Sequence, residues 1–118
     1  MKEETNPLGN VYISHRAIAT IAYQSALESY GVVGLAAKNF TEGITQAIVK
    51  DPTMGVKIDF DGQQIKIEMY IIVEYGTHIK SVATSVASSV RYQIEKALGI
   101  TVSEVNVHVR GLRISNTD

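Results

Sequence analysis

The sequence predicts an α+β domain of two layers: a small mixed or antiparallel sheet with two amphipathic helices on one of its faces. Two segments, 15–30 and 79–98, repeat apolar residues at the 3.6-residue spacing of a helix. Other segments alternate apolar and polar residues, as half-buried strands do. The chain has 118 residues and is 45% hydrophobic, which suits one domain with one core. We expect this domain to span 9–114, between a flexible 1–8 and a frayed 115–118.

The first helix is expected between two short extended segments. We expect a strand over 11–13, and Ser14 is suited to cap the helix over 15–30. Gly31 fits the position after that helix, because glycine accepts the left-handed backbone found there. The run 31–36 is apolar and bracketed by glycines, which predicts a buried turn or a brief strand.

The middle of the chain combines an ambiguous segment with a hairpin. In 38–50 the apolar positions share one helical face, so we expect a short, loosely held helix that the Asp-Pro pair at 51–52 ends. The alternation over 55–60 predicts a strand. The Asp-Gly pair at 61–62 is a strong signal for a hairpin turn, and a long strand over 63–75 follows it.

The last third predicts a helix and a closing strand. Thr77 is suited to cap the helix over 79–98, which has the clearest apolar stripe in the sequence, and Gly99 ends it. Valines alternate with polar residues over 105–109. Gly111 shifts the phase of that alternation, which predicts a β-bulge.

Composition argues against several functional classes. Eleven Lys and Arg against 12 Asp and Glu give a net charge of −1, so the basic excess typical of nucleic-acid binders is missing. The chain has no cysteine, which excludes disulfides, thiolate metal sites and cysteine nucleophiles. The three histidines, His15, His78 and His108, lack the spacing of a metal motif. We therefore predict no catalytic residue, no cofactor and no metal site.

The sequence also carries no membrane signal. No apolar run is long enough to cross a bilayer, and residues 1–10 do not resemble a signal peptide. We expect a cytoplasmic protein without a membrane span of its own, or one held at the inner face of the membrane through a partner.

Tyr70 and Ile72 interrupt the alternation of the long strand. They share its polar face with two glutamates, where a simple solvent-facing strand would carry only polar side chains. An apolar island rimmed by charges predicts an interaction surface. Arg110 and Arg113 of the closing strand would add rim charges. In the alternative, a loop or the 38–50 segment covers the island.

Four segments resemble the alkaline-shock, or envelope stress response, family of bacterial proteins. They are NVYIS running into HRAIATIA at 10–22, YGVVGLA at 30–36, MYIIVEYG at 69–76 and VNVHVRGL at 105–112. The resemblance covers 9–114 and is strongest to short, YloU-type members. It implies a cytoplasmic protein with no established enzymatic activity, linked to envelope stress and cell-wall homeostasis. Some members self-associate beneath the membrane through an integral-membrane partner.

The resemblance predicts a non-enzymatic scaffold or adaptor that forms homo-oligomers and contacts a membrane-anchored partner. Two alternatives stay open. Gly31 to Gly34 fits the GXXG of KH domains, which would make the protein nucleic-acid-associated, although both inner positions are valine and nucleic acid is not the favoured partner. YloU-type genes tend to lie near a fatty-acid kinase gene, which suggests a regulatory subunit of a lipid-metabolism enzyme.

Overall fold

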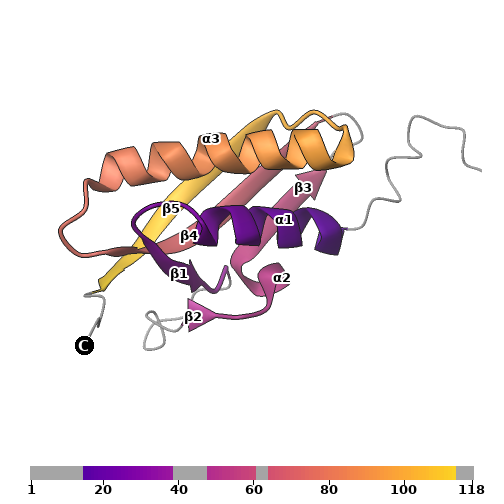
Figure 1. Cartoon of the computed structure of the whole chain (residues 1–118). Helices are drawn as coiled ribbons and strands as arrows, with labels where there is room; N and C mark the ends of the chain where they lie inside the picture. The colour runs from indigo at the N-terminus through magenta and orange to yellow at the C-terminus, as the bar shows by residue number, and fades with distance from the viewer. Residues whose placement is uncertain (1–14, 39–47, 61–63, 114–118) are drawn as a thin grey trace, which may run out of the picture.

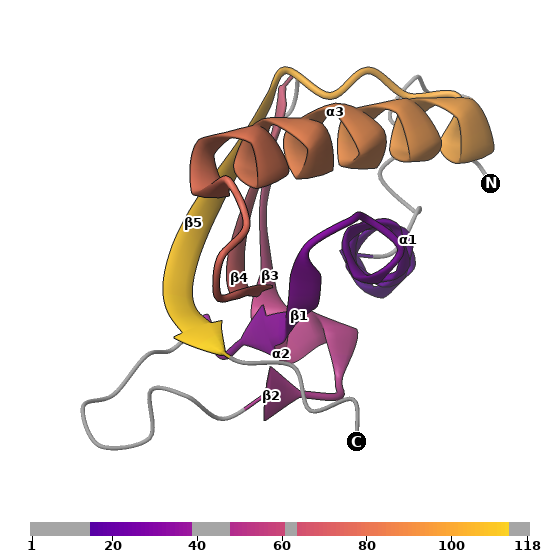
Figure 2. The same ribbon diagram turned by 60° about the vertical axis from the view of Figure 1, so that its left-hand side comes forward.

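Two helices cover one face of a five-stranded mixed sheet, which confirms the predicted α+β fold (Figure 1). The computed structural model describes residues 15–38, 48–60 and 64–113. Its elements in chain order are α1 (His15–Leu27), β1 (Val32–Ala36), β2 (Ile48–Val49), α2 (Pro52–Gly55), β3 (Val56–Phe60), β4 (Ile65–Glu74), α3 (Ile79–Leu98) and β5 (Glu104–Arg113). Seen from the side, α1 and α3 lie on the same side of the sheet (Figure 2).

The long strand β4 is the centre of the sheet. β5 runs parallel to β4 over nearly its whole length, from Lys66 opposite Glu104 to Glu74 opposite Arg113. The other edge of β4 is shared by two antiparallel partners, β3 along its first half and β1 along its second. β2 extends the sheet beyond β1. β4 is therefore hydrogen-bonded along both edges, and the run from Met69 to Val73 is buried.

The main core lies between the sheet and the two helices. Val82, Val86, Val90 and Ile94 form the buried stripe of α3, at the spacing that places them on one face. Alternate residues of β4 meet this stripe and are fully buried: Ile67, Met69, Ile71 and Val73. The predicted helix over 79–98 is confirmed in its bounds, and Gly99 follows it in the left-handed conformation with φ of 67°.

α1 is shorter than the predicted 15–30. After Leu27 the backbone tightens, because the amide of Ser29 bonds the carbonyl of Ala26, three residues back. Gly31 then takes a φ of +89°, and a Cβ there would lie 2.8 Å from a methyl of Val82. The turn thus lets α1 lead into β1 close against α3, and the expected brief strand at 31–36 is confirmed as β1.

The helix predicted over 38–50 is wrong at its described end. Ile48 and Val49 form β2, paired with Ala36 and Leu35 of β1. The phenol of Tyr23 donates a hydrogen bond to the carbonyl of Val49 at 2.9 Å, which ties β2 to α1. The rest of the predicted helix, 39–47, lies outside the described residues.

The Asp-Pro pair at 51–52, which was predicted to end a helix, begins α2. Asp51 accepts hydrogen bonds from the amide and hydroxyl of Thr53, and Pro52 occupies the first turn of α2, where a missing N–H costs nothing. Those two bonds, with help from Arg16 at 3.5 Å, lower the pKa of Asp51.

The hairpin strands confirm their predicted alternation, with slightly shorter bounds. β3 and β4 pair antiparallel from Val56 opposite Met69 to Phe60 opposite Ile65. The expected turn at 61–62, the strand over 11–13, the cap Ser14 and both predicted terminal segments, 1–8 and 115–118, lie outside the described residues.

Of two further predictions, the helix cap at Thr77 is wrong and the bulge in β5 is confirmed. Thr77 does not cap the helix: its hydroxyl donates to the carbonyl of Glu74 at 2.7 Å, and the N-cap position belongs to His78. The predicted bulge in β5 is confirmed, because Val109 lies opposite Ile71 and Gly111 opposite Ile72. Arg110 is the extra residue.

Candidate interaction surface on the second sheet face

The four residues predicted as an interaction surface lie on the face of the sheet opposite α1 and α3. Tyr70 and Ile72 come from β4, and Arg110 and Arg113 come from β5. The parallel register brings the two strands together there, with Tyr70 opposite His108. Arg110 lies two residues after His108 and shares its face, and its guanidinium lies over the ring of Tyr70. Arg113 lies at the end of the paired strands, opposite Glu74.

Tyr70 and Ile72 are buried, so the apolar island is covered. Ile72 is 0% exposed and Tyr70 8%, and they form a second apolar cluster with Ala36, against which Val33 packs. The sequence left open whether this island is a contact surface or is covered. The structure places both side chains under cover, so β4 is buried on both faces between Met69 and Val73.

Tyr70 and the three side chains that contact it form what we call the tyrosine cluster: Glu68, Tyr70, His108 and Arg110. The rings of Tyr70 and His108 stack, with centroids 4.9 Å apart and planes 15° from parallel. The guanidinium carbon of Arg110 lies 4.9 Å from the centre of the Tyr70 ring, within the range of a cation–π contact. Tyr70 is thus contacted by two successive outward-facing residues of β5.

Glu68 links the polar ends of this cluster. Its Oε1 accepts the hydroxyl of Tyr70 at 3.1 Å and lies 3.3 Å from Nε2 of His108. The side chains of Glu68 and His108 stay 38% and 44% exposed. The cluster therefore has a buried aromatic base and an accessible polar rim.

Burial raises the pKa of Tyr70, because the phenolate would be poorly solvated, and the carboxylate of Glu68 adds to the effect. Arg110 opposes it weakly. At neutral pH the phenol is consequently a protonated donor and not a nucleophile. The tyrosine cluster thus offers one phenol donor that is already engaged, one carboxylate, one imidazole and one guanidinium.

The sequence predicted Tyr70 and Arg110 as members of the surface, and it placed Glu68 on the same strand face as Tyr70. The sequence also placed His108 beside them on the condition that the two strands pair, without assigning it a role. That pairing could not be read from local spacing, since residues 75–103 separate β4 from β5 in the chain.

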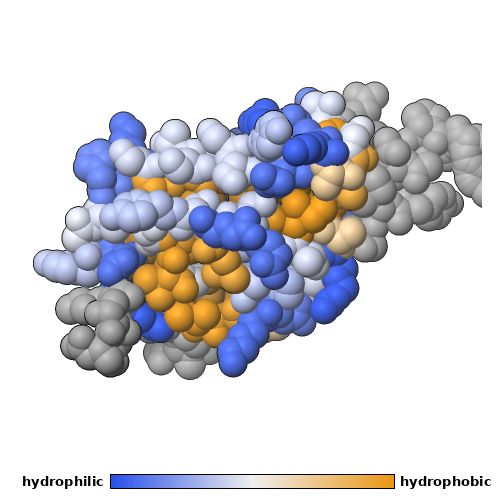
Figure 3. All heavy atoms as spheres, viewed as in Figure 1, coloured by the Kyte–Doolittle hydropathy of each residue, from blue (hydrophilic) through white to orange (hydrophobic). Residues whose placement is uncertain are grey.

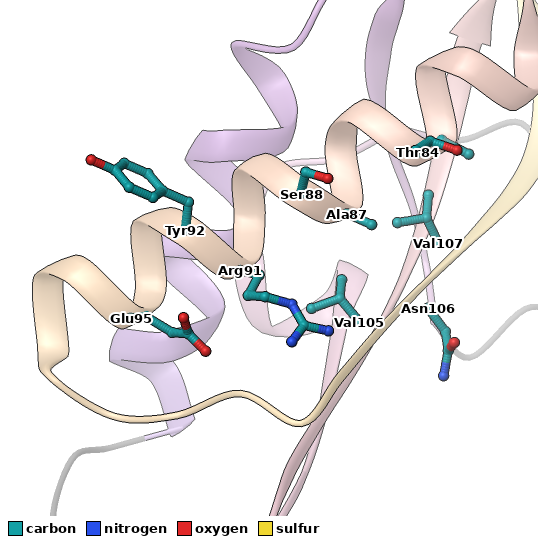
Figure 4. Close-up of a pocket in the computed structure, with 10 residues that line it drawn as sticks. Thr84, Ala87, Ser88, Arg91, Tyr92, Glu95, Val105, Asn106 and Val107 are labelled. Atoms are coloured by element: carbon teal, nitrogen blue, oxygen red, sulfur yellow. The ribbon is translucent and has the colours of Figure 1, made fainter.

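A groove between α3 and β5 was also missed (Figure 4). Its lining residues are Ala83, Thr84, Ala87, Ser88, Arg91, Tyr92, Glu95, Val105, Asn106 and Val107. At one end, Arg91 donates to the carbonyl of Val102 and Glu95 accepts its amide, at 3.1 and 2.9 Å. Arg91 and Glu95 of the groove thus bind the backbone of the segment that connects α3 to β5.

The helix side of the molecule carries apolar surface as well (Figure 3). Exposed large apolar side chains include Leu27 of α1, Ile48 of β2, Met54 of α2 and Ile79 of α3. Ile48 and Ile79 lie on predicted apolar stripes, which the sequence pattern assigns to the core.

Among the described residues, no three His, Asp or Glu side chains gather as metal ligands would. The three histidines lie apart in the fold, at the start of α1, just before α3, and in β5. The glycine pair of the KH-like motif joins a helix to a strand, with Gly34 inside β1, whereas a KH clamp lies between two helices.

The fold defines a class of protein, the two-layer α+β domain with helices on one side of a mixed sheet. Two solved structures of a MamM C-terminal domain share it. One variant matches with a TM-score of 0.53 and 17% identity, covering 89% of this chain and 92% of that one. A second, a zinc form, matches with a TM-score of 0.52 and 16% identity, covering 86% and 89%. At such identities the likeness shows the fold alone.

Within that class, the chain belongs to the alkaline shock protein 23 family, described by its cell envelope-related function, whose model matches residues 3–114. The uncharacterized protein YloU of Bacillus subtilis is 41% identical over 110 residues, 92% of each chain. YqhY of the same organism is 32% identical over 114 residues, covering 96% of this chain and 84% of that one. Spy1614 of Streptococcus pyogenes is 30% identical over 108 residues, 90% and 89%.

These comparisons confirm the resemblance found in the sequence, and they give the function at one level only: it is related to the cell envelope. Among the described residues, no helix has both the length and the apolar character needed to cross a membrane.

Proposed function

We propose that this protein is a non-enzymatic scaffold or adaptor in the cell-envelope stress response and in wall or membrane homeostasis. It acts by self-association and by contacts with other proteins, one of them anchored in the membrane. The observation that carries the proposal is the tyrosine cluster, an ordered aromatic and charged group whose polar rim is exposed on the sheet face opposite the helices.

The tyrosine cluster has the properties of a protein-binding surface. Tyrosine and arginine are enriched among residues that dominate binding energy, because they combine large contact area with directional polar groups. Here the buried ring of Tyr70 holds the accessible rim in place, because it stacks on His108 and its hydroxyl donates to Glu68. Rim side chains that are already held lose little further entropy on binding, so a contact through the rim is favoured.

Charges of both signs make the face selective. Arg110 and Arg113 flank the apolar pair, and Glu68 and Glu74 lie beside them on β4. A partner must match this pattern, and mismatched like charges would be rejected. The membrane-anchored partner is inferred from the envelope-related family of the chain.

The test is affinity purification of the tagged protein from crosslinked native cells, reading proteins and nucleic acid together. We expect the protein itself and one or two membrane proteins. Arg113→Glu, which reverses a rim charge, should lose the membrane proteins. Lys80→Glu is the matched control, since it makes the same charge change at an exposed position of α3.

Other recoveries would contradict the proposal. RNA without membrane proteins would favour a nucleic-acid-associated role, and a soluble kinase without them would favour a regulatory subunit. Equal loss of membrane proteins in both variants would show that the second face is not the contact.

A further inference from the structure

The outer edge of β5 is an unpaired strand edge in the part of the chain that the structure describes. There, β5 pairs with β4 alone, and it forms the margin of the sheet in Figure 2. An edge strand presents a row of backbone donors and acceptors that another strand can use. The register with β4 is regular from Glu104 to Val109, before the bulge, so this part of the edge is free of irregularities.

The sequence of that edge matches itself in reverse. Residues 104–110 read E-V-N-V-H-V-R, with Val107 at the centre. In an antiparallel pair, opposite residues share a face of the sheet. A second copy aligned on Val107 would therefore place Glu104 opposite Arg110 at both ends.

The inner positions of this alignment match as well. Val105 would lie opposite Val109, and Val107 opposite itself, all on the side of the helices. Asn106 would lie opposite His108 on the other side. Shifting the alignment by one residue would put valines opposite polar residues, and shifting it by two would separate the opposite charges.

The groove along α3 contains apolar side chains of β5 that pairing with a second copy would bury. Val105 and Val107 point from β5 toward α3 in Figure 4, yet both remain partly exposed. The facing positions of α3 are small, namely Ala83, Thr84, Ala87 and Ser88. A strand added to β5 would cover the valines from the open side, and burial of apolar area is the main driving force of association.

We propose that two copies of this chain pair their β5 edges antiparallel about a twofold axis at Val107, making one continuous sheet. The inference rests on the self-association in the proposed function and names its surface. The occupant is a second copy, because an unrelated strand would gain the backbone bonds but not the charge match at both ends. The interface is isologous, so each pair away from the axis occurs twice.

Charge reversal tests the alignment. Glu104→Arg and Arg110→Glu each place like charges opposite one another at both ends of the dimer. We expect each variant alone to self-associate about tenfold more weakly in sedimentation equilibrium at low salt. An equimolar mixture of the two should associate as strongly as the wild type, because a strand with two arginines then meets a strand with two glutamates.

A cysteine placed on the axis gives a second measurement that does not depend on charge. The chain has no cysteine of its own. Opposite residues of an antiparallel pair have Cα atoms about 4.5–5.5 Å apart, within disulfide range. Val107→Cys should therefore oxidise to a covalent dimer, whereas Val105→Cys, displaced from the axis in both copies, should not.

The outcomes separate this inference from the proposed function. If the wild type associates but neither reversal changes its affinity, or the mixture does not recover, another surface mediates self-association and edge pairing is overturned. A wild type that stays monomeric at all concentrations overturns edge pairing too, and the adaptor role is then decided by the purification alone. If Arg110→Glu fails to fold by circular dichroism, the two cysteine variants decide.

Discussion

Tyr70 owes its position to three different contacts on one ring. His108 stacks on it, Arg110 lies over it, and its hydroxyl bonds Glu68. Each contact contributes little alone, on the order of 1 kcal/mol. Together they fix one rotamer at the boundary between the apolar cluster and the charged rim.

Removing the hydroxyl should have an effect that depends on pH. Tyr70→Phe loses the bond to Glu68, so we expect it to be less stable by about 1 kcal/mol at pH 7. Because the folded pKa of Tyr70 is raised above 10.0, the unfolded phenol ionises first as pH rises. The wild type therefore loses stability above about pH 10, and the gap to Tyr70→Phe narrows. Urea unfolding between pH 7 and 11 measures this gap.

The control for this prediction is Tyr92→Phe, since Tyr92 is exposed on α3. It removes a hydroxyl from an exposed side chain, so its free energy of unfolding at pH 7 should stay within about 0.5 kcal/mol of the wild type. A gap for Tyr70→Phe that is constant between pH 7 and 11 would show that the phenol is not shielded from ionisation.

At the scale of single elements, the glycine turns define where helices and strands meet. Gly31 and Gly76 both have positive φ, +89° and +96°. Only Gly31 is crowded: an added Cβ would lie 2.8 Å from Val82, while nothing lies within 4 Å at Gly76. The same substitution at both sites therefore separates backbone strain from steric clash.

Gly76→Ala should cost about 1–2 kcal/mol, the penalty of the left-handed backbone for a residue with a Cβ. Gly31→Ala should cost that amount and about 1–3 kcal/mol more, because α1 and α3 must move apart. Chemical unfolding of the two variants measures the difference. Equal losses would mean that the turn at Gly31 can shift without disturbing α3.

Elements whose signal is local could be predicted, and those set by distant pairing could not. The stripe of α3 and the alternation of β4 follow from the spacing of their own residues. Ile48 and Val49 fit a helical face equally well, and only pairing with β1 makes them a strand. The interaction surface shows the same division: Tyr70 and Ile72 stand out from the alternation of β4 itself, whereas their contact with the predicted Arg110 depends on the pairing of two distant strands.

At the scale of the whole molecule, β4 separates two apolar clusters. Ile71 belongs to the main core beneath the helices, and Ile72 to the cluster on the second face. Both side chains are fully buried. The sheet is thus packed on both sides at this point, unlike a sheet with one simple solvent face.

Alanine substitutions can show whether the second cluster contributes as much to the free energy of unfolding as the main core does. We expect Ile71→Ala and Ile72→Ala each to cost about 2–5 kcal/mol in urea unfolding, because each leaves a buried cavity. Leu112→Ala is the control, since Leu112 is exposed and should lose less than about 1 kcal/mol. A small loss of unfolding free energy for Ile72→Ala alone would mean that the second cluster is loosely packed around Ile72.

The parallel pairing of β4 with β5 has a consequence for how the protein is made. β4 leaves the ribosome first, and its long edge has no partner until the whole of α3 and then β5 have followed. At about 5–20 residues per second, the interval from the end of β4 to the end of β5 lasts roughly 2–8 s. During that time the nascent chain displays its most apolar strand with one side open, so this is the stage of biosynthesis at which a chaperone would protect it from aggregation.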